Sequence, residues 1–266
     1  MDIRSFFPAQ QQYADLPVRL RQEEYRTISL LHLDLIEKVL QSDEEPLLQR
    51  VLSVAEQGYF QRFKYMKRKK EWLGGRIAAK AALLAFTRAD AAEQDLRRIT
   101  VLPDTHGRPV IEAFSADLSA QGNRGKALSI SLSHSDGFAV ALASESGNCG
   151  IDLQEISAKL AGLTDHFATD AELRLLAEQT DYDDYDEDTC LTMLWTVKEA
   201  LKKALLHDQS VIFSATELCE IFRLNDSVRC FTCTVQGRRQ SVLVRSFPPY
   251  ILSMTAADNI NESNHA

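Results

Sequence analysis

The sequence predicts an α+β protein, and three observations support this class. Apolar residues recur at helical spacing from Ala55 to Arg88 and again from about Thr189 to Leu206. Short β-branched runs separated by turn residues predict antiparallel hairpins. These helices and strands come in blocks, without the strand–helix alternation that a parallel sheet requires. With 266 residues, of which 45% are hydrophobic, the chain can bury the core of one large domain or two small ones.

In the N-terminal half, the residues before Ala55 carry only weak signals, such as the apolar run 27–36, and receive no assignment. From Ala55 to Arg88 the periodicity predicts helices, with Gly74-Gly75 as a candidate break. Residues 99–103 and 110–114 then predict one hairpin. Residues 129–133 and 138–144 predict a second hairpin, because Asp136-Gly137 supplies the favoured turn chemistry between them.

In the C-terminal half, a short strand at 149–156 precedes helices through Glu178 and a strong helix from about Thr189 to Leu206. Short strands come next at 231–235, 241–247 and 251–257. The polar segment 144–148 is the expected boundary between the halves. We therefore expect an N-terminal half at 1–146, a C-terminal half at 147–257 and a disordered tail at 258–266.

The charge of the chain excludes some functions and favours others. A formal net charge of −8 argues against a protein that binds nucleic acid over its whole surface. Eight basic residues and one acidic residue nevertheless lie between Arg62 and Lys80, which predicts a local anion site.

The start of the chain shows no secretory signal, and no apolar stretch is long enough to span a bilayer. Five scattered cysteines favour a reducing compartment, so we expect a cytoplasmic protein that binds no membrane. Cys230 and Cys233 lie in a strand-like run, where alternation would put their sulfurs on opposite faces. We expect no metal or redox site there.

The helix at 194–206 is the most informative stretch. On a helical wheel, its apolar residues form one stripe, and a second group of side chains is expected on a polar face: Trp195, Lys198, Glu199, Lys202 and Lys203. A tryptophan beside a carboxylate and three ammonium groups is not what packing alone demands. The alternative is a solvated face with a Glu199–Lys203 pair that contributes ~0.2–0.5 kcal/mol.

A second candidate site lies just after Gly150. On a strand, Asp152 and Gln154 share one face, whereas Glu155 points the other way. Together with a distant glutamate, Asp152 could hold Mg²⁺, which prefers one or two carboxylates plus substrate phosphates and water. The alternative is an aspartate that merely closes a strand.

A third candidate site is the Ser133-His134-Ser135 segment, whose side chains can donate hydrogen bonds to an anionic oxygen. Arg108 is expected to be exposed in the turn of the preceding hairpin. The alternatives are plain turn chemistry and an exposed arginine. A Ser-His-Asp hydrolase triad does not fit, because residues this close along a hairpin cannot easily form a relay and no G-x-S-x-G elbow is present.

The order of these motifs is more specific than any one of them. Basic EWLGGRIAAKAAL, GRPVI, SLSHSDGFAVALAS, GIDLQEI and LWTVKEALKKAL together resemble the Sfp-type 4′-phosphopantetheinyl transferases. The family hallmark is G-[IV]-D-x-E and, further along the chain, W-x-x-K-E-[AS]-x-x-K. The second part is intact at Trp195, Lys198, Glu199, Ala200 and Lys203. Phe167 and Glu172 also fall where the family usually has a Phe and a Glu that open a helix. The first part departs at its second acid, which is Gln154 here.

The resemblance implies a fold of two similar α+β halves that form a pseudo-dimer in one chain, with the site between them, and hence a monomer. It implies transfer of 4′-phosphopantetheine from coenzyme A to a serine of an acyl- or peptidyl-carrier protein, with release of 3′,5′-ADP. The carrier would serve fatty acid, polyketide or nonribosomal peptide biosynthesis.

The resemblance also assigns roles to residues. Asp152 and Glu199 would bind Mg²⁺, or Mn²⁺ as a substitute, with Gln154 as an additional oxygen ligand. Glu199 would take the serine proton, and Lys203 would stabilise the departing phosphate. The residues expected to hold coenzyme A are Arg76, Arg108, Ser133, His134, Lys198 and Lys203.

Two other functions remain as alternatives. One is a non-catalytic module that binds carrier proteins and has lost metal chemistry at Gln154. The intact Glu199 and Lys203 argue against it. The other is a Mg²⁺-dependent nucleotide pyrophosphohydrolase, against which the lack of helices with multiple carboxylates argues.

Overall fold

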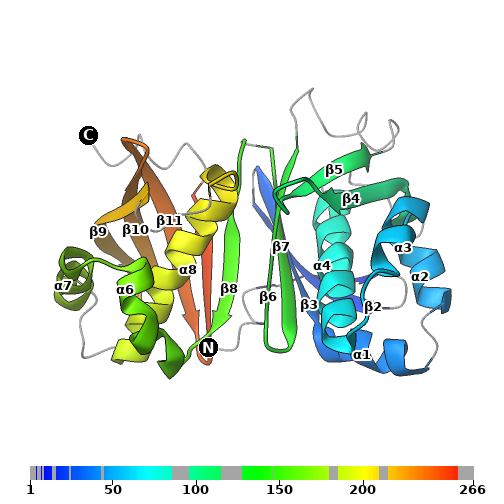
Figure 1. The fold of residues 1–266 in the computed structure, drawn as a ribbon, viewed down its shortest axis with the longest axis horizontal. Helices are drawn as coiled ribbons and strands as arrows, with labels where there is room; N and C mark the ends of the chain where they lie inside the picture. Colours follow the sequence, from blue (N-terminus) through cyan, green and yellow to red (C-terminus); the bar gives the residue numbers. More distant parts are fainter. Residues whose placement is uncertain are drawn as a thin grey trace. The chain divides into compact units, whose positions relative to one another are not determined.

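The computed structural model describes residues 4, 7, 9–13, 16–23, 25–42, 45–85, 96–114, 128–145, 147–179, 185–209 and 215–256. The chain divides into two compact units, an N-terminal unit Arg4–Asn148 and a C-terminal unit that begins at Cys149. Each unit contains a five-stranded antiparallel sheet and one long helix (Figure 1). The tail predicted at 258–266 lies outside the described residues.

The N-terminal sheet has the strand order β1-β2-β3-β7-β6, and all its neighbours are antiparallel. The strands are β1 (Ala9–Tyr13), β2 (Leu16–Glu23), β3 (Arg26–His32), β6 (Ser129–Ser135) and β7 (Phe138–Ser144). The predicted hairpin of β6 and β7 is confirmed. Its tight turn needs a left-handed residue, which Gly137 supplies with φ 86°.

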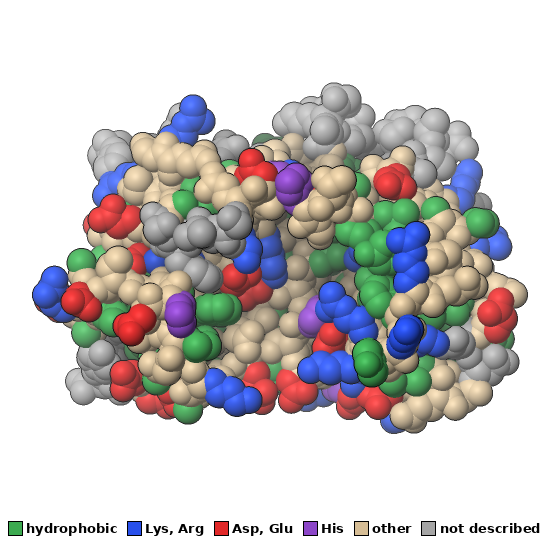
Figure 2. All heavy atoms as spheres, in the orientation of Figure 1, with side chains coloured by type: hydrophobic (Ala, Val, Ile, Leu, Met, Phe, Trp, Pro, Cys, Tyr) green, Lys and Arg blue, Asp and Glu red, His purple; other side chains and the backbone are tan. Residues whose placement is uncertain are grey.

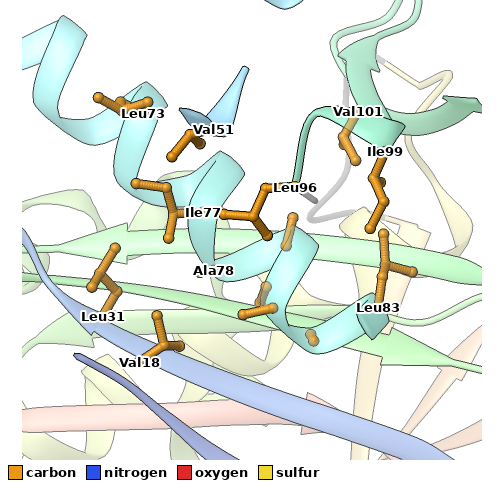
Figure 3. Packing of buried hydrophobic residues seen from close by; sticks show 14 of the residues in the cluster. Val18, Leu31, Val51, Leu73, Ile77, Ala78, Leu83, Leu96, Ile99 and Val101 are labelled. Atoms are coloured by element: carbon orange, nitrogen blue, oxygen red, sulfur yellow. The ribbon is translucent and has the colours of Figure 1, made fainter. Parts of the chain in front are cut away.

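Helices cover one face of this sheet (Figure 1). They are α1 (Leu33–Ser42), α2 (Glu45–Val51), α3 (Val54–Phe60) and α4 (Met66–Ala85). The long α4 packs on β7 and β3, and its apolar side chains form the centre of the unit's core (Figure 3). Gly74-Gly75 does not break α4. A Cβ at Gly74 would lie 2.3 Å from Leu33 Cδ2, so this glycine lets α1 approach α4 closely.

A short 3₁₀ turn (Leu96–Arg98) leads into the predicted hairpin of β4 (Ile99–Pro103) and β5 (Pro109–Phe114), which forms a separate two-stranded sheet. The Asp104 side chain organises the turn between the strands. Its Oδ1 accepts hydrogen bonds from the backbone N–H of His106 and of Arg108. Gly107, with φ 86°, completes the turn and leaves Arg108 at the end of the hairpin.

The C-terminal sheet has the strand order β8-β12-β11-β10-β9 and is also antiparallel throughout. The strands are β8 (Ile151–Glu155), β9 (Thr216–Asn225), β10 (Val228–Val235), β11 (Arg238–Phe247) and β12 (Tyr250–Thr255). Cys233 belongs to the hydrophobic core beneath the helices, and Cys230, three residues earlier on the same strand, does not. The two sulfurs therefore lie on opposite faces, as alternation predicts.

The long helix α8 (Glu187–Leu205) packs on β12 and β8 (Figure 1, yellow). It begins at Asp186, whose side chain accepts a hydrogen bond from the Thr189 N–H. Within the sheet-facing surface of α8, Thr196 Oγ1 lies 2.7 Å from Ser253 Oγ of β12. The remaining helices are a 3₁₀ helix (Ala158–Leu163), α6 (Thr164–Phe167) and α7 (Asp170–Gln179).

The predicted α+β class is confirmed, with two similar halves that each combine a small antiparallel sheet and helices. The unassigned N-terminal region proves to be the β1–β3 meander and, after it, α1 and α2. Among the described residues, no helix is both long and apolar enough to cross a membrane.

Candidate active site

The beginning of β8 lies against the backbone of α8, and Gly150 makes this possible. A Cβ at Gly150 would lie 1.9 Å from Ala200 O and 3.1 Å from Ala204 N. Any larger side chain would therefore push the helix away from the strand. The glycine of the G-I-D motif thus sets the distance between the strand that carries Asp152 and the helix that carries Glu199 and Lys203.

Asp152 and Lys203 form a direct ion pair. Lys203 Nζ lies 2.6 Å from Asp152 Oδ1 and also donates a hydrogen bond to Ile151 O at 3.0 Å. The Asp152 side chain is 8% exposed, and that of Lys203 is 26% exposed. The structure therefore brings together two residues that lie 51 positions apart in the sequence and were both predicted to act in the site.

Glu199 lies one helical turn before Lys203, so both side chains leave α8 on the same side. The Glu199 side chain is 17% exposed, and its Oε1 lies 3.4 Å from Lys202 Nζ. The Glu199 carboxylate is therefore partly accessible to a ligand.

Strand pairing shows which way the neighbours of Asp152 point. Asp152 lies opposite Ser253, and Gln154 lies opposite Ile251 of the core beneath α8. Both side chains are therefore on the α8 face, and alternation turns Glu155 to the other face. Gln154 is half-buried, and its Nε2 donates a hydrogen bond to Glu155 O at 3.3 Å, so its carbonyl oxygen is the atom that could bind a cation.

The donor set fits a magnesium ion that is shared with a substrate. Among the residues that the structure describes, no group of three or more His, Cys, Asp and Glu could hold a metal by itself. Asp152 and Glu199 could supply two carboxylates, and Gln154 could supply a neutral oxygen. Mg²⁺ typically binds through one or two carboxylates and completes its shell with phosphate oxygens and water.

The prediction that Lys198 lies on the polar face is wrong, and its burial argues against the predicted contact with coenzyme A. Lys198 is 1% exposed, and its Nζ lies 2.7 Å from Glu172 Oε1. The reason is its position four residues after Leu194 and three before Leu201, which places it beside the apolar stripe. A cation can be buried there because a carboxylate pairs with it.

Arg76 was also expected to hold coenzyme A, and the structure places it in the interior of the N-terminal unit. Its side chain stacks over Trp72, with Cζ 4.6 Å from the ring centroid, and the residue is 6% exposed. Its Nε has no hydrogen-bond partner among the described residues. Burial lowers the pKa of the Arg76 guanidinium to about 10, although Glu56 and Tyr59 oppose the shift. In this conformation Arg76 packs against an aromatic ring, and only a small part of it can meet a ligand.

The other predicted coenzyme residues are also in the N-terminal unit. Arg108 is half-buried, and its Nη2 donates a hydrogen bond to Asn148 Oδ1 at 3.0 Å. His134 is exposed, and its Nδ1 lies 3.9 Å from Glu71 Oε1 of α4. Ser133 is buried on β6, where alternation turns it to the face opposite His134. The strand therefore does not present Ser133 and His134 side by side.

The basic segment Arg62–Lys80 divides into buried and exposed parts. Lys80 is fully buried and pairs with Glu56, so it contributes nothing to a surface anion site. Lys69 stacks over Phe60, and Lys70 pairs with Glu37. The residues that remain exposed are Arg62, Lys64, Lys67 and Arg68. Figure 2 shows blue side chains beside green hydrophobic ones over the α3–α4 region, where these residues lie.

Comparison with known proteins gives a consistent result for the C-terminal unit. A sequence model of the 4′-phosphopantetheinyl transferase superfamily matches residues 148–253. A holo-[acyl-carrier-protein] synthase of Staphylococcus haemolyticus is 33% identical over 86 residues, which are 32% of this chain and 72% of that protein. The chain belongs to the 4′-phosphopantetheinyl transferase superfamily.

Other holo-[acyl-carrier-protein] synthases are also similar to this chain. A holo-[acyl-carrier-protein] synthase of Oceanobacillus iheyensis is 27% identical over 114 residues, which are 43% of this chain and 88% of that protein. The crystal structure of a Bacillus anthracis holo-(acyl-carrier-protein) synthase in complex with CoA (3′,5′-ADP) is 27% identical, covers 45% of this chain and 92% of that one, and has a TM-score of 0.37.

Three features of the site in this transferase were not predicted from the sequence: the ion pair between Asp152 and Lys203, the close approach of β8 to α8 at Gly150, and the partner of Lys198. Only the last had a local signal. Thr169 and Glu172 have the spacing of a capping box, which places a glutamate at the start of a helix. The other two depend on how α8 packs on β8.

Proposed function

We propose that this protein transfers 4′-phosphopantetheine from coenzyme A to a serine hydroxyl of an acyl- or peptidyl-carrier protein in a Mg²⁺-dependent reaction. The observation that carries the proposal is the Asp152–Lys203 contact of 2.6 Å, with Glu199 one turn earlier on the same helix. This arrangement combines a carboxylate that can bind a cation, a second carboxylate that can accept a proton and a lysine that can stabilise the leaving phosphate. Membership of the superfamily supports the same reaction.

The bonds of the reaction can be assigned. The serine oxygen forms a bond to the phosphorus that bears pantetheine, and the bond from that phosphorus to the bridging oxygen breaks. 3′,5′-ADP leaves with the electron pair, and the serine proton goes to Glu199, directly or through water. Lys203 balances the charge that develops on the leaving phosphate.

The residues that would hold Mg²⁺ are Asp152 and Glu199, with Gln154 as a neutral oxygen ligand. Bound there, the ion would neutralise the pyrophosphate and polarise the phosphorus under attack. The family resemblance assigns contacts with the coenzyme's phosphates to Arg108 and His134, and the exposed basic residues of α4 carry charge of the sign that phosphates attract. We expect the enzyme to act as a monomer in the cytoplasm. Its five cysteines form no disulfide, which suits a reducing compartment.

Mass spectrometry of an apo carrier protein tests the proposal directly. Incubation with coenzyme A and Mg²⁺ should add the mass of one phosphopantetheine, and chelation of the metal should prevent the addition. Glu199→Gln should lower the rate by about 10²–10⁴-fold while the protein stays folded, because the helix loses a proton acceptor but keeps its apolar stripe. A Glu199→Gln variant that modifies the carrier at the wild-type rate would remove Glu199 from the mechanism.

The pyrophosphohydrolase alternative makes a different prediction for the same mixture. It would release products from coenzyme A in the absence of any carrier, whereas the transferase should consume coenzyme A only when a carrier serine is available.

A further inference from the structure

Lys198 is the residue immediately before Glu199, and it is anchored in the protein interior. Its Nζ lies 2.7 Å from Glu172 Oε1 and 2.9 Å from Glu172 Oε2, and it donates a hydrogen bond to Thr216 O at 3.3 Å. Both side chains of the ion pair are nearly inaccessible, at 1% and 2%. α8 is therefore tied at this point to the start of α7 and the start of β9.

The Glu172 carboxylate is itself held in place by the backbone. Thr169 N–H donates to Glu172 Oε2 at 2.9 Å, and Thr169 Oγ1 accepts from Glu172 N–H at 3.2 Å, which completes a capping box. Leu218 N–H donates to the other oxygen, Oε1, at 2.9 Å. With both oxygens fixed, the carboxylate offers Lys198 one location, so the rotation of α8 about its axis is constrained.

The N-terminal unit contains the same arrangement. Glu56 forms a capping box with Ser53 at the start of α3, and its Oε1 accepts a hydrogen bond from Val101 N–H of β4 at 3.0 Å. Its other oxygen pairs with Lys80 of α4, and both side chains are fully buried. Lys80 also donates a hydrogen bond to Val51 O at 2.7 Å. In each unit, a capping glutamate thus links a short helix, a later strand and a lysine of the long helix.

The two long helices differ in the residues that come after the anchoring lysine. The next residue is Glu199 in α8 and Ala81 in α4, and the residue five positions after the lysine is Lys203 in α8 and Ala85 in α4. Both units use the ion pair to dock a helix, but only in the C-terminal unit does the docked helix carry reactive side chains next to the anchor.

We propose that Glu172 and Lys198 form a positioning pair, which sets the direction of the Glu199 carboxylate by fixing the rotation of α8. The inference rests on the proposed function. A carboxylate at the periphery of a helix lies about 5–6 Å from the axis, so a rotation of about 20° moves it by about 2 Å. A displacement of about 1 Å in a catalytic site can lower the rate about 10²-fold.

The test compares matched variants in the two units. Glu172→Gln and the double variant Glu172→Gln/Lys198→Met remove the charges of the C-terminal pair, and Glu56→Gln and Glu56→Gln/Lys80→Met do so in the N-terminal pair. In both units the glutamine keeps a single acceptor oxygen and can retain only one of the two backbone hydrogen bonds that the glutamate accepts, so the loss is matched. Methionine fills the volume of the lysine stem. For each variant we would measure the unfolding temperature, kcat, the KM for coenzyme A, the Mg²⁺ requirement, and binding of Mn²⁺ alone by electron paramagnetic resonance.

Folded C-terminal variants should lose at least about tenfold in kcat and bind Mn²⁺ several-fold more weakly, with the KM for coenzyme A changed by less than about twofold. The N-terminal variants, at a comparable loss of thermal stability, should keep kcat and Mn²⁺ affinity near the wild-type values. Lys198→Arg, which keeps the charge, should retain more activity than the neutral variants and serves as the test if the double variant does not fold.

Equal losses of kcat in the two units would overturn the inference, because both pairs would then act through stability alone. So would unchanged kcat and Mn²⁺ affinity in folded C-terminal variants. If the wild-type protein modifies no apo carrier, the proposed function fails. The Mn²⁺ measurements on the same variants would still decide whether the pair orients Glu199.

Discussion

Replacing Gly150 by alanine would place a methyl carbon 1.9 Å from Ala200 O, a backbone atom that cannot turn aside. A contact of 3.0–3.4 Å is the closest that real Cβ atoms tolerate, so strand and helix must separate by about 1.1–1.5 Å. Glu199 directly precedes Ala200, so this displacement carries it away from Asp152. Overpacking of this kind costs about 1–3 kcal/mol, and a shift of about 1 Å lowers the catalytic rate about 10²-fold.

The assay is transfer to an apo carrier protein, read by mass spectrometry at saturating coenzyme A and Mg²⁺, together with the unfolding temperature of each protein. Gly162→Ala in the same unit is the matched control, because a Cβ there meets nothing within 4 Å. Gly150→Ala should remain folded, with a lower unfolding temperature and a much lower kcat, and Gly162→Ala should behave like the wild type. A Gly150→Ala protein with wild-type kcat would refute the claim that this contact sets the geometry of the site.

Four other substitutions probe the proposed metal site, the proposed coenzyme contacts and the cap of α8. Gln154→Glu should lower the Mg²⁺ concentration needed for half-maximal rate, whereas Glu155→Ala should leave it unchanged. If metal titrations instead showed no change for Gln154→Glu and a large loss for Glu155→Ala, Glu155 would be the residue that faces the metal. Arg108→Ala should raise the KM for coenzyme A more than it lowers kcat, which initial-rate kinetics would check. Asp186→Ala should destabilise the protein by about 1 kcal/mol through loss of the α8 cap. Hydrogen bonds from the Thr189 hydroxyl and N–H lower the pKa of Asp186, so this stabilisation is present above the usual aspartate range and lost as pH falls through the lowered pKa. The difference in unfolding free energy between wild type and Asp186→Ala should therefore shrink in acid.

The regular elements that could be predicted from the sequence are those with a strong local pattern. Local sequence patterns are enough to identify the helical spacing of α4 and α8. They are also enough to identify the turn residues of the β4–β5 and β6–β7 hairpins. Strand β3 (Arg26–His32) is buried along almost its whole length, but only three of its seven residues are apolar, and the alternation that begins at Thr27 ends at Leu30-Leu31. So short an alternating pattern is a weak strand signal. β9 was missed because only its first half is packed under α7 and its second half is exposed.

The candidate site was predictable as a set of residues but not as an arrangement. Asp152 and Glu199 were recognised through their motifs. The contact between Asp152 and Lys203 depends on the packing of α8 on β8, which no local pattern encodes. Lys198 was misplaced because a charged residue at the border of an apolar stripe is ordinarily assigned to solvent. Its burial depends on Glu172, 26 residues earlier, and on the backbone groups that orient that carboxylate.

The ion pair between Asp152 and Lys203 should couple the binding of the cation to the binding of the coenzyme. Before any ligand arrives, the carboxylate is already charge-balanced by the ammonium group at 2.6 Å. A divalent cation that binds Asp152 alone must either displace Lys203 or lie beside its positive charge, and both are unfavourable. A pyrophosphate that attracts Lys203 at the same moment removes this repulsion. Cation and coenzyme should therefore bind with positive cooperativity, each raising the affinity for the other by the same factor.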